Sequence, residues 1–119
     1  MKIHALLELR WSDQDANHHV NNATIVTLLE EVRVRALKDI TDGLRVVRTL
    51  EVRYDGELTY GQPVDGYAWI SKVGNTSYEV SHELVQNQEV KVFATTIIVA
   101  LDPDTRRPTP VKGLTDGLP

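Results

Sequence analysis

The sequence contains no cysteine, and this absence removes several kinds of chemistry. Without thiols the chain has no disulfide framework, no cysteine-bound zinc or iron–sulfur site and no cysteine nucleophile. It also lacks any apolar run approaching the roughly 20 residues that cross a bilayer. The N-terminal stretch MKIHALLELRW carries charges at Glu8 and Arg10 and has no small-residue cleavage site, so it does not resemble a secretion signal. We therefore expect a cytoplasmic protein with no membrane partner.

Clustered positive charge is also scarce. The formal net charge is −4, and no basic run occurs, so nucleic acid is not an expected partner. The small basic group of Arg106, Arg107 and Lys112 has two interpretations, a contribution to solubility or contact with the phosphates of a ligand.

The 119 residues, 41% hydrophobic and 25% charged, are typical of one globular domain. We expect this single domain to span 1–119, with 102–119 forming an irregular tail that is rich in proline and glycine.

One segment has the periodicity of an amphipathic helix. Within 23–38, apolar residues recur at Ile25, Leu28, Leu29 and Val32, which is the spacing of one helical face. Asn22 stands before this segment and is a favourable N-cap.

Five other segments are predicted to be strands, at 2–10, 46–54, 64–73, 77–85 and 90–101. The last is the longest apolar run and is expected to be a central strand. Turn residues separate the later segments, which predicts hairpins and a mostly antiparallel sheet. The expected class is therefore α+β, with a curved five-stranded sheet packed on one long helix. Because one helix covers only part of such a sheet, we also expect dimerisation.

The polar stretch SDQDANHHVNN, residues 12–22, stands directly before the predicted helix. The first-turn N–H groups of a helix have no intrahelical partner and lie at the positive end of the helix dipole. The stretch thus combines a carboxylate, imidazoles, amides and donors for an oxyanion, which suits acyl transfer without a serine or cysteine nucleophile. A metal site formed by the histidines with Asp13 or Asp15 is an alternative, but so short a span rarely places its ligands well, and we expect no metal.

Residues 11–22, WSDQDANHHVNN, resemble the W-x-D-x-D-x-N-x-H-V-N-N motif of acyl-ACP thioesterases. They are also similar to the D-x-D-x-x-G-H-V-N-N motif of the 4-hydroxybenzoyl-CoA thioesterase group. The resemblance extends to LEEVR at 29–33, similar to L-E-E-A-R, and to GNTSY at 74–78, similar to G-x-T-S-Y. It implies a hotdog-fold thioesterase. His18 departs from the glycine common in the acyl-CoA type, and Ile25 and Leu28 replace common aromatic residues.

The resemblance also implies site residues. Asp15 matches the catalytic carboxylate, as general base or nucleophile, while Asn17 and His19 match the accompanying amide and imidazole. Asn22 matches the position whose backbone N–H faces the thioester oxygen. A further acidic residue is expected near Asp55 or Glu57. The candidate substrate-binding residues are Ile25, Leu28, Leu29, Asp55 and Ser77.

The implied function is hydrolysis of an acyl-CoA, with acyl-ACP as the other carrier, in fatty acid metabolism. The site would lie between the subunits of a homodimer or homotetramer, and no cofactor is expected. Two alternatives remain: a hotdog protein that binds acyl-CoA without turnover, and an enoyl thioester hydratase. The hydratases have a D-x-N-x-x-H pattern, in which the histidine comes one residue later than His19 does here. Asp15, Asn17 and His19 also have a simpler interpretation as turn or structural residues.

Overall fold

The computed structural model describes residues 2–39 and 43–111. It contains one long helix and five strands: β1 (Ile3–Leu7), α1 (Asn22–Leu37), β2 (Leu44–Tyr54), β3 (Val64–Val73), β4 (Ser77–Gln86) and β5 (Glu89–Leu101). A short 3-10 turn, Trp11–Asp13, lies between β1 and α1. Within the described ranges no helix is long and apolar enough to span a bilayer.

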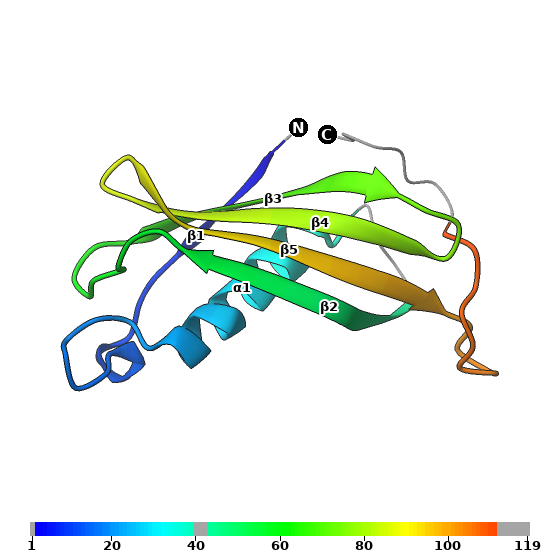
Figure 1. Cartoon of the computed structure of the whole chain (residues 1–119), viewed down its shortest axis with the longest axis horizontal. Helices are drawn as coiled ribbons and strands as arrows, with labels where there is room; N and C mark the ends of the chain where they lie inside the picture. Colours follow the sequence, from blue (N-terminus) through cyan, green and yellow to red (C-terminus); the bar gives the residue numbers. More distant parts are fainter. Residues whose placement is uncertain (1, 40–42, 112–119) are drawn as a thin grey trace.

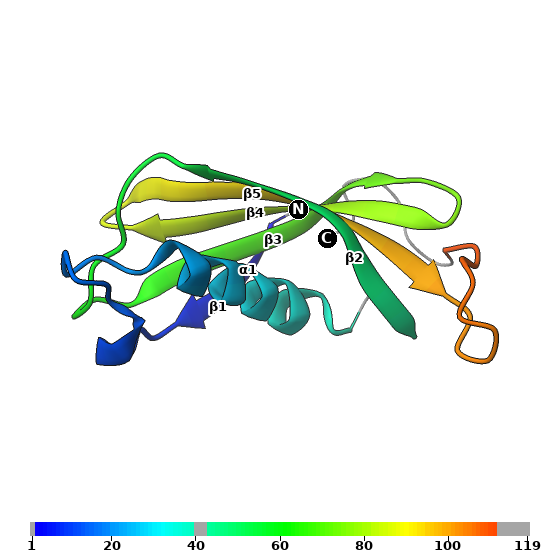
Figure 2. The ribbon, with the colours of Figure 1, turned by 60° about the horizontal axis from the view of Figure 1, so that its bottom comes forward.

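The strands form one antiparallel sheet in the order β1-β3-β4-β5-β2. The sheet is curved, and α1 lies across its concave face (Figures 1 and 2). The expected α+β class, with one helix on a curved five-stranded sheet, is therefore confirmed. Residues 102–111 are irregular, as predicted, and the rest of the expected tail, including Lys112, lies outside the described residues.

Three details differ from the sequence prediction. β5 lies inside the sheet as predicted, although β4 and not β5 stands at its exact middle. Only the β3–β4 and β4–β5 connections are hairpins, because β2 pairs with β5 across the sheet and the chain must cross over to begin β3. The N-cap of α1 is Asn21, not Asn22, since the Asn21 side chain accepts a hydrogen bond from the backbone N–H of Ala23 at 2.8 Å.

The core lies between α1 and the concave face of the sheet. Ile25, Leu28, Leu29 and Val32 of the helix are all buried there, as the periodicity predicted. Gly66 of β3 allows this close packing, because a Cβ at that position would overlap with the Val32 side chain. The helix therefore rests mainly on β1, β3 and β4.

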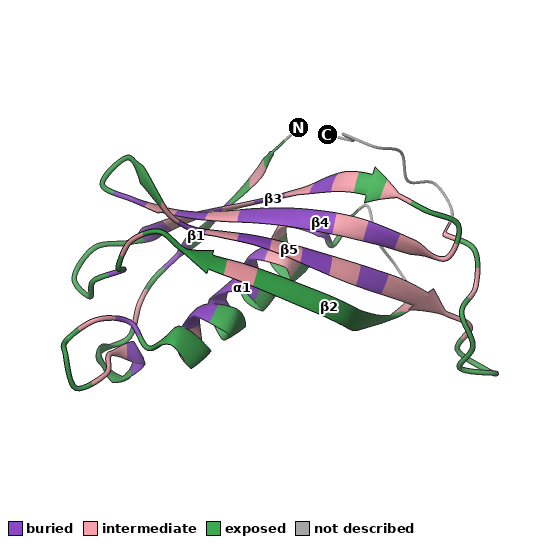
Figure 3. Ribbon diagram, viewed as in Figure 1, coloured by how far each residue is buried: buried purple, intermediate pink, exposed green. Residues whose placement is uncertain are grey.

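The edge strand β2 is exposed along nearly its whole length (Figure 3). Its apolar residues Val46, Val47 and Leu50 are 41%, 48% and 37% exposed. The pairing with β5 skips Arg48, which is the extra residue of a bulge between Val47 and Thr49. A bulge reverses the alternation of side chains between the two faces of a strand. Residues two positions apart in β2 therefore share a face only when both lie on the same side of Arg48.

His82 of β4 is buried on the same face of the strand as Val80 and Leu84. Its Nδ1 lies 3.4 Å from the carbonyl oxygen of Ala94, and its Nε2 has no partner within the described part of the chain. Burial, the largest cause, lowers the pKa of His82 from 6.5 to about 4, and the positive charge of Arg33 adds to the effect. The folded protein therefore holds this imidazole neutral.

This burial predicts an acid-sensitive fold. In the unfolded chain His82 takes up a proton as the pH falls below 6.5, whereas in the folded chain it does so only near 4. Because the unfolded state binds the extra proton, the free energy of unfolding should fall through this window, by up to about 3 kcal/mol. Chemical denaturation of the wild type and of His82→Gln at several pH values measures the effect. The variant should show a shallower decline, and an equal decline in both proteins would contradict the assignment.

Candidate active site

A cavity of about 350 Å³ opens where the polar loop, the start of α1 and the segment after β2 meet. The loop runs directly into α1, and the segment after β2 passes beside the loop (Figure 2), so two separate parts of the sequence, 15–25 and 54–58, supply the lining residues. The cavity is lined by Asp15, Asn17, His19, Val20, Asn22, Ile25, Tyr54, Asp55, Gly56, Glu57 and Leu58.

The loop folds tightly around the Asp15 carboxylate. Asp15 Oδ1 accepts hydrogen bonds from the backbone N–H groups of Asn17, at 2.8 Å, and His19, at 3.3 Å. The backbone N–H of Asp15 donates to the carbonyl of His19 at 2.7 Å. Between them, His18 has a φ of 62°, a left-handed conformation that glycine adopts more easily. This backbone accounts for the glycine common at the matching position of the acyl-CoA type.

Asp13 holds the loop in place through hydrogen bonds of its side chain and its backbone. Its side chain is buried and accepts hydrogen bonds from the backbone N–H of Arg10, at 2.8 Å, and from Arg10 Nη2, at 2.9 Å. Its carbonyl accepts the N–H of Asn21 at 2.9 Å, and the N–H of Val20 donates to the carbonyl of Leu58 at 3.0 Å. These bonds join the loop to Arg10 before the 3-10 turn, to the residue that caps α1 and to the segment after β2.

The start of α1 supplies a free backbone donor. Asn21 caps the N–H of Ala23, and the carbonyl of Asn21 accepts the N–H of Ile25 at 3.0 Å. For the N–H of Asn22, the described residues offer no acceptor. Asn22 also lines the cavity, so a donor at the positive end of the helix dipole is available there.

The last residue of β2, a tyrosine, and two acidic residues of the segment after it also line the cavity. His19 Nε2 lies 2.9 Å from Glu57 Oε2, so the imidazole turns toward this segment. Asp55 also lines the cavity but is paired with Arg53 at 2.8 Å. Both candidates for the further acidic residue are therefore present, and Glu57 is the one that contacts His19.

Sequence reasoning missed Tyr54, whose hydroxyl donates to the carbonyl of Asn22 at 3.4 Å. The sequence did contain a sign of this position, because Tyr54 comes just before Asp55 and Glu57 and must therefore lie near them.

The other sequence-predicted residues lie in different places. Ile25 is buried and forms part of the cavity wall. Leu28 and Leu29 are buried in the core and do not line this cavity. Ser77 begins β4, beside the turn in which its carbonyl accepts the N–H of Gly74 at 2.7 Å. Within one chain the structure therefore joins Asp15, Asn17, His19, Asn22, Ile25 and Asp55, but not Leu28, Leu29 or Ser77.

The alternative of a metal site can be compared with the geometry. Across residues 2–39 and 43–111, no three His, Asp or Glu side chains are grouped so that they could hold a metal ion. The His19 imidazole, one of the proposed ligands, faces Glu57 and not Asp13. The arrangement thus consists of a carboxylate, an imidazole–carboxylate pair and a backbone donor around one cavity.

The chain belongs to the thioesterase-like superfamily, whose family model matches residues 9–114. No curated protein matches the sequence at a significant level.

Solved structures of hotdog thioesterases resemble the whole fold. A predicted thioesterase from Bacillus stearothermophilus is 31% identical, with a TM-score of 0.86 over 93% of this chain and 88% of the other. A thioesterase from Thermus thermophilus, solved with coenzyme A and zinc, is 26% identical, with a TM-score of 0.86 over 93% and 92% of the two chains. An acyl-CoA hydrolase from Staphylococcus aureus, solved with butyryl coenzyme A, has the same fold at 17% identity, with a TM-score of 0.80 over 99% and 73%. The expected hotdog fold and thioesterase family are confirmed.

Proposed function

We propose that the chain hydrolyses acyl-CoA thioesters to the free acid and the thiol, with Asp15 as the catalytic carboxylate. The observation that supports this proposal is the hydrogen bonding of the two oxygens of that carboxylate. Asp15 Oδ1 accepts two backbone hydrogen bonds, while no hydrogen bond reaches Oδ2 from any described residue. One oxygen is therefore held in place, and the other, on a residue that lines the cavity, has no described partner, which leaves it available for water or substrate. The coenzyme A and butyryl coenzyme A found with two of the similar proteins support CoA as the carrier.

As a general base, Asp15 takes a proton from water while the water oxygen bonds to the thioester carbonyl carbon. The carbonyl oxygen becomes negative and is stabilised by the free N–H of Asn22 and the helix dipole. The carbon–sulfur bond then breaks, and the proton passes to the departing thiolate. As a nucleophile, Asp15 would instead bond to the carbonyl carbon and expel the thiolate, and water would then cleave the resulting anhydride to the free acid and the restored carboxylate. The same Oδ2 position serves both routes.

Asn17 and His19 position the reacting groups. The backbone N–H groups of both hold Asp15, so the loop conformation fixes the carboxylate through them. The side chain of Asn17 borders the cavity, where its amide reaches the attacking water. The pairing of His19 with Glu57 stabilises the closed loop and keeps the imidazole at the cavity rim.

The test is thiol release from a panel of acyl-CoAs by the wild type and by Asp15→Asn. The substitution preserves the size of the side chain and an acceptor oxygen for the loop, but removes the base. Turnover should fall by about 100-fold or more, the scale expected for loss of a general base. Asp104→Asn, in an exposed turn after β5, is the matched control and should keep wild-type turnover.

Two results would contradict the proposal. Release of thiol by Asp15→Asn at the wild-type rate would remove Asp15 from the reaction. If the wild type binds acyl-CoA but releases no thiol from acyl-CoA or from acyl-ACP, the chain would instead be a non-catalytic binding protein.

We also propose that the active form is a homodimer, or a tetramer built from it, joined along β2. An edge strand with open N–H and C=O groups and exposed Val46, Val47 and Leu50 is a surface that a second strand can cover. A two-fold axis requires the two β2 strands to pair antiparallel, which would continue the sheet from one protomer to the other.

The double variant Val47→Lys, Leu50→Lys should prevent this pairing, because it places ammonium groups in the apolar contact. Light scattering after size exclusion should give a dimer or tetramer for the wild type and a monomer for the variant. Val90→Lys, on an equally exposed valine in the β4–β5 hairpin, is the matched control and should retain the wild-type mass. A monomeric wild type would contradict the proposal.

A further inference from the structure

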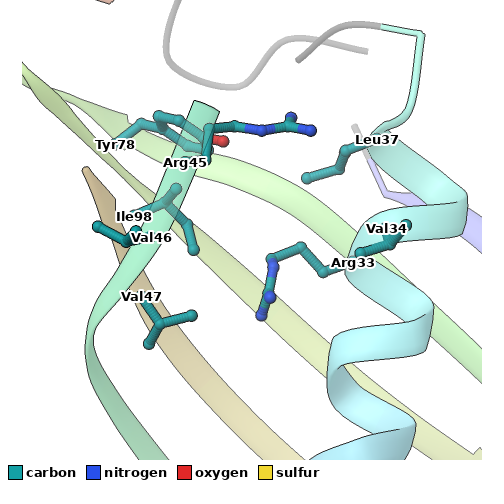
Figure 4. A pocket seen from close by; sticks show the side chains of 8 residues that line it. All are labelled: Arg33, Val34, Leu37, Arg45, Val46, Val47, Tyr78 and Ile98. Carbon is teal, nitrogen blue, oxygen red and sulfur yellow. The ribbon is translucent and has the colours of Figure 1, made fainter. Parts of the chain in front are cut away.

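A second cavity, of about 140 Å³, lies between the C-terminal half of α1 and the start of β2. Figure 4 shows side chains from both elements directed into it. The lining residues are Arg33, Val34, Leu37, Arg45, Val46, Val47, Tyr78 and Ile98. Two arginines thus share a small space whose other walls are largely apolar and include no aspartate or glutamate.

The charge of Arg33 is poorly compensated. Its side chain is only 16% exposed, and its paired carboxylate, Glu30, is 3.8 Å away and 66% exposed. Burial, the largest cause, lowers the pKa of Arg33, and the nearby charge of Arg45 lowers it further, whereas Glu30 and Tyr78 raise it. Arg45 itself makes no ion pair with any described residue. Among the described residues, the distant and exposed Glu30 is the one acidic partner of these two guanidinium groups, so an anion bound between them would be stabilised by both charges.

The shape and chemistry of the cavity favour a carboxylate carried on a hydrocarbon arm. A guanidinium presents parallel N–H donors that match the two oxygens of a carboxylate. Leu37, Val47 and Ile98 provide apolar walls on which methylene groups can pack. The Tyr78 side chain, almost fully buried, also borders the cavity and brings its hydroxyl toward the arginines (Figure 4).

The bulge in β2 places Arg45 on the helix side of the sheet. Val47 pairs with Ile98, which is buried under α1, and Tyr54 pairs with Val92, which is also buried there. The bulge adds one residue at Arg48. A residue before Arg48 and a residue after it therefore face the same side of the sheet only when their numbers differ by an odd number. Arg45 therefore faces the same side as Val47 and Tyr54.

Antiparallel pairing of two β2 strands would bring the two cavities together across the interface. The Asp15 cavity lies at the end of β2 that carries Tyr54, and the arginine cavity lies at the end that carries Arg45. A two-fold axis near the middle of β2 sets the start of one strand beside the end of the other. The arginine cavity of one protomer would then adjoin the Asp15 cavity of the second protomer.

From this arrangement we infer that the thioesterase prefers acyl groups with a terminal carboxylate, which Arg33 and Arg45 of one protomer bind while Asp15 of the other serves as the catalytic carboxylate at the thioester. The inference rests on the proposed function and on the β2 dimer. The hydrocarbon arm lies along the interface, and the carboxylate enters the arginine cavity.

The test compares adipoyl-CoA, which ends in a carboxylate, with hexanoyl-CoA, which has the same chain length and no second charge. The wild type should give a kcat/KM at least about tenfold higher for adipoyl-CoA, as expected for a charge-assisted pair of hydrogen bonds. Arg45→Met should remove this preference by lowering kcat/KM for adipoyl-CoA far more than for hexanoyl-CoA. Arg33→Met should do the same. If that helix variant folds poorly, the Arg45 variant still decides the test, because Arg45 lies at the exposed start of β2.

Arg35→Met is the matched control. Arg35 lies two residues along the same helix, outside the cavity, and is paired with Glu31 at 3.4 Å on the exposed face. Its replacement removes the same charge but should leave the preference for adipoyl-CoA intact.

The phosphates of CoA are the other anions that the arginines could bind, so the same acyl groups are also tested as N-acetylcysteamine thioesters. A preference for the adipoyl ester that persists without phosphates supports the inference. An equal effect of Arg45→Met on both CoA substrates, with no preference among the phosphate-free esters, overturns it. Hexanoyl-CoA turnover equal to that of adipoyl-CoA also overturns it but leaves the proposed thioesterase standing, whereas no thiol release from any substrate overturns both.

Discussion

The structure depends on one mismatch, that of a single helix covering a sheet wider than itself. α1 packs mainly on β1, β3 and β4, where Gly66 lets it approach the sheet closely. The side of the sheet that carries β2 is left with exposed apolar residues and an open edge. Cavities form at both ends of the helix because nothing within the described part of the chain fills the space beside it. The dimer, the reaction site and the preference for a charged acyl group, all three of them proposals, rest on this geometry.

The reactive loop is ordered by backbone hydrogen bonds, and this arrangement leaves side chains free for chemistry. Asp13 is buried and binds Arg10, while the carbonyl of Asp13 and the N–H of Val20 attach the loop to its neighbours. Asp15 is held through one oxygen only. Two nearby aspartates of the same motif thus have opposite roles, since one stabilises the loop and the other remains available at the cavity.

Local patterns were enough to predict most of the fold. The apolar spacing of α1, the alternation in β4 and the turn residues between the hairpins each report on neighbouring positions. The same patterns could not reveal that β2 pairs with β5 or that β4 is central, because those facts depend on contacts between distant segments. The bulge at Arg48 was also hidden, since one extra residue in a strand leaves no compositional signal.

The candidate site shows the same division. The loop motif grouped Asp15, Asn17, His19 and Asn22, and the structure brings all four to one cavity, because they are close in sequence and lie at the start of α1. Leu28 and Leu29 belong to the core, and only the packing of the helix decides which leucines line a cavity. The pairing of His19 with Glu57, and the meeting of Arg33 with Arg45, join residues from segments far apart in the sequence. Such pairs depend on how distant segments pack against each other, so they cannot be read from the sequence.

The central claim, that each reaction site is shared by two protomers, is tested most directly with a mixed dimer. Chains carrying Asp15→Asn and Arg45→Met are co-expressed with different tags, and the heterodimer is assayed on adipoyl-CoA. If the site is shared, one of its two sites contains both Asp15 and Arg45, and the rate should be about half that of the wild type, far above either variant homodimer. A heterodimer no more active than the average of the two homodimers would contradict the account, because each chain would then use its own Asp15 and Arg45.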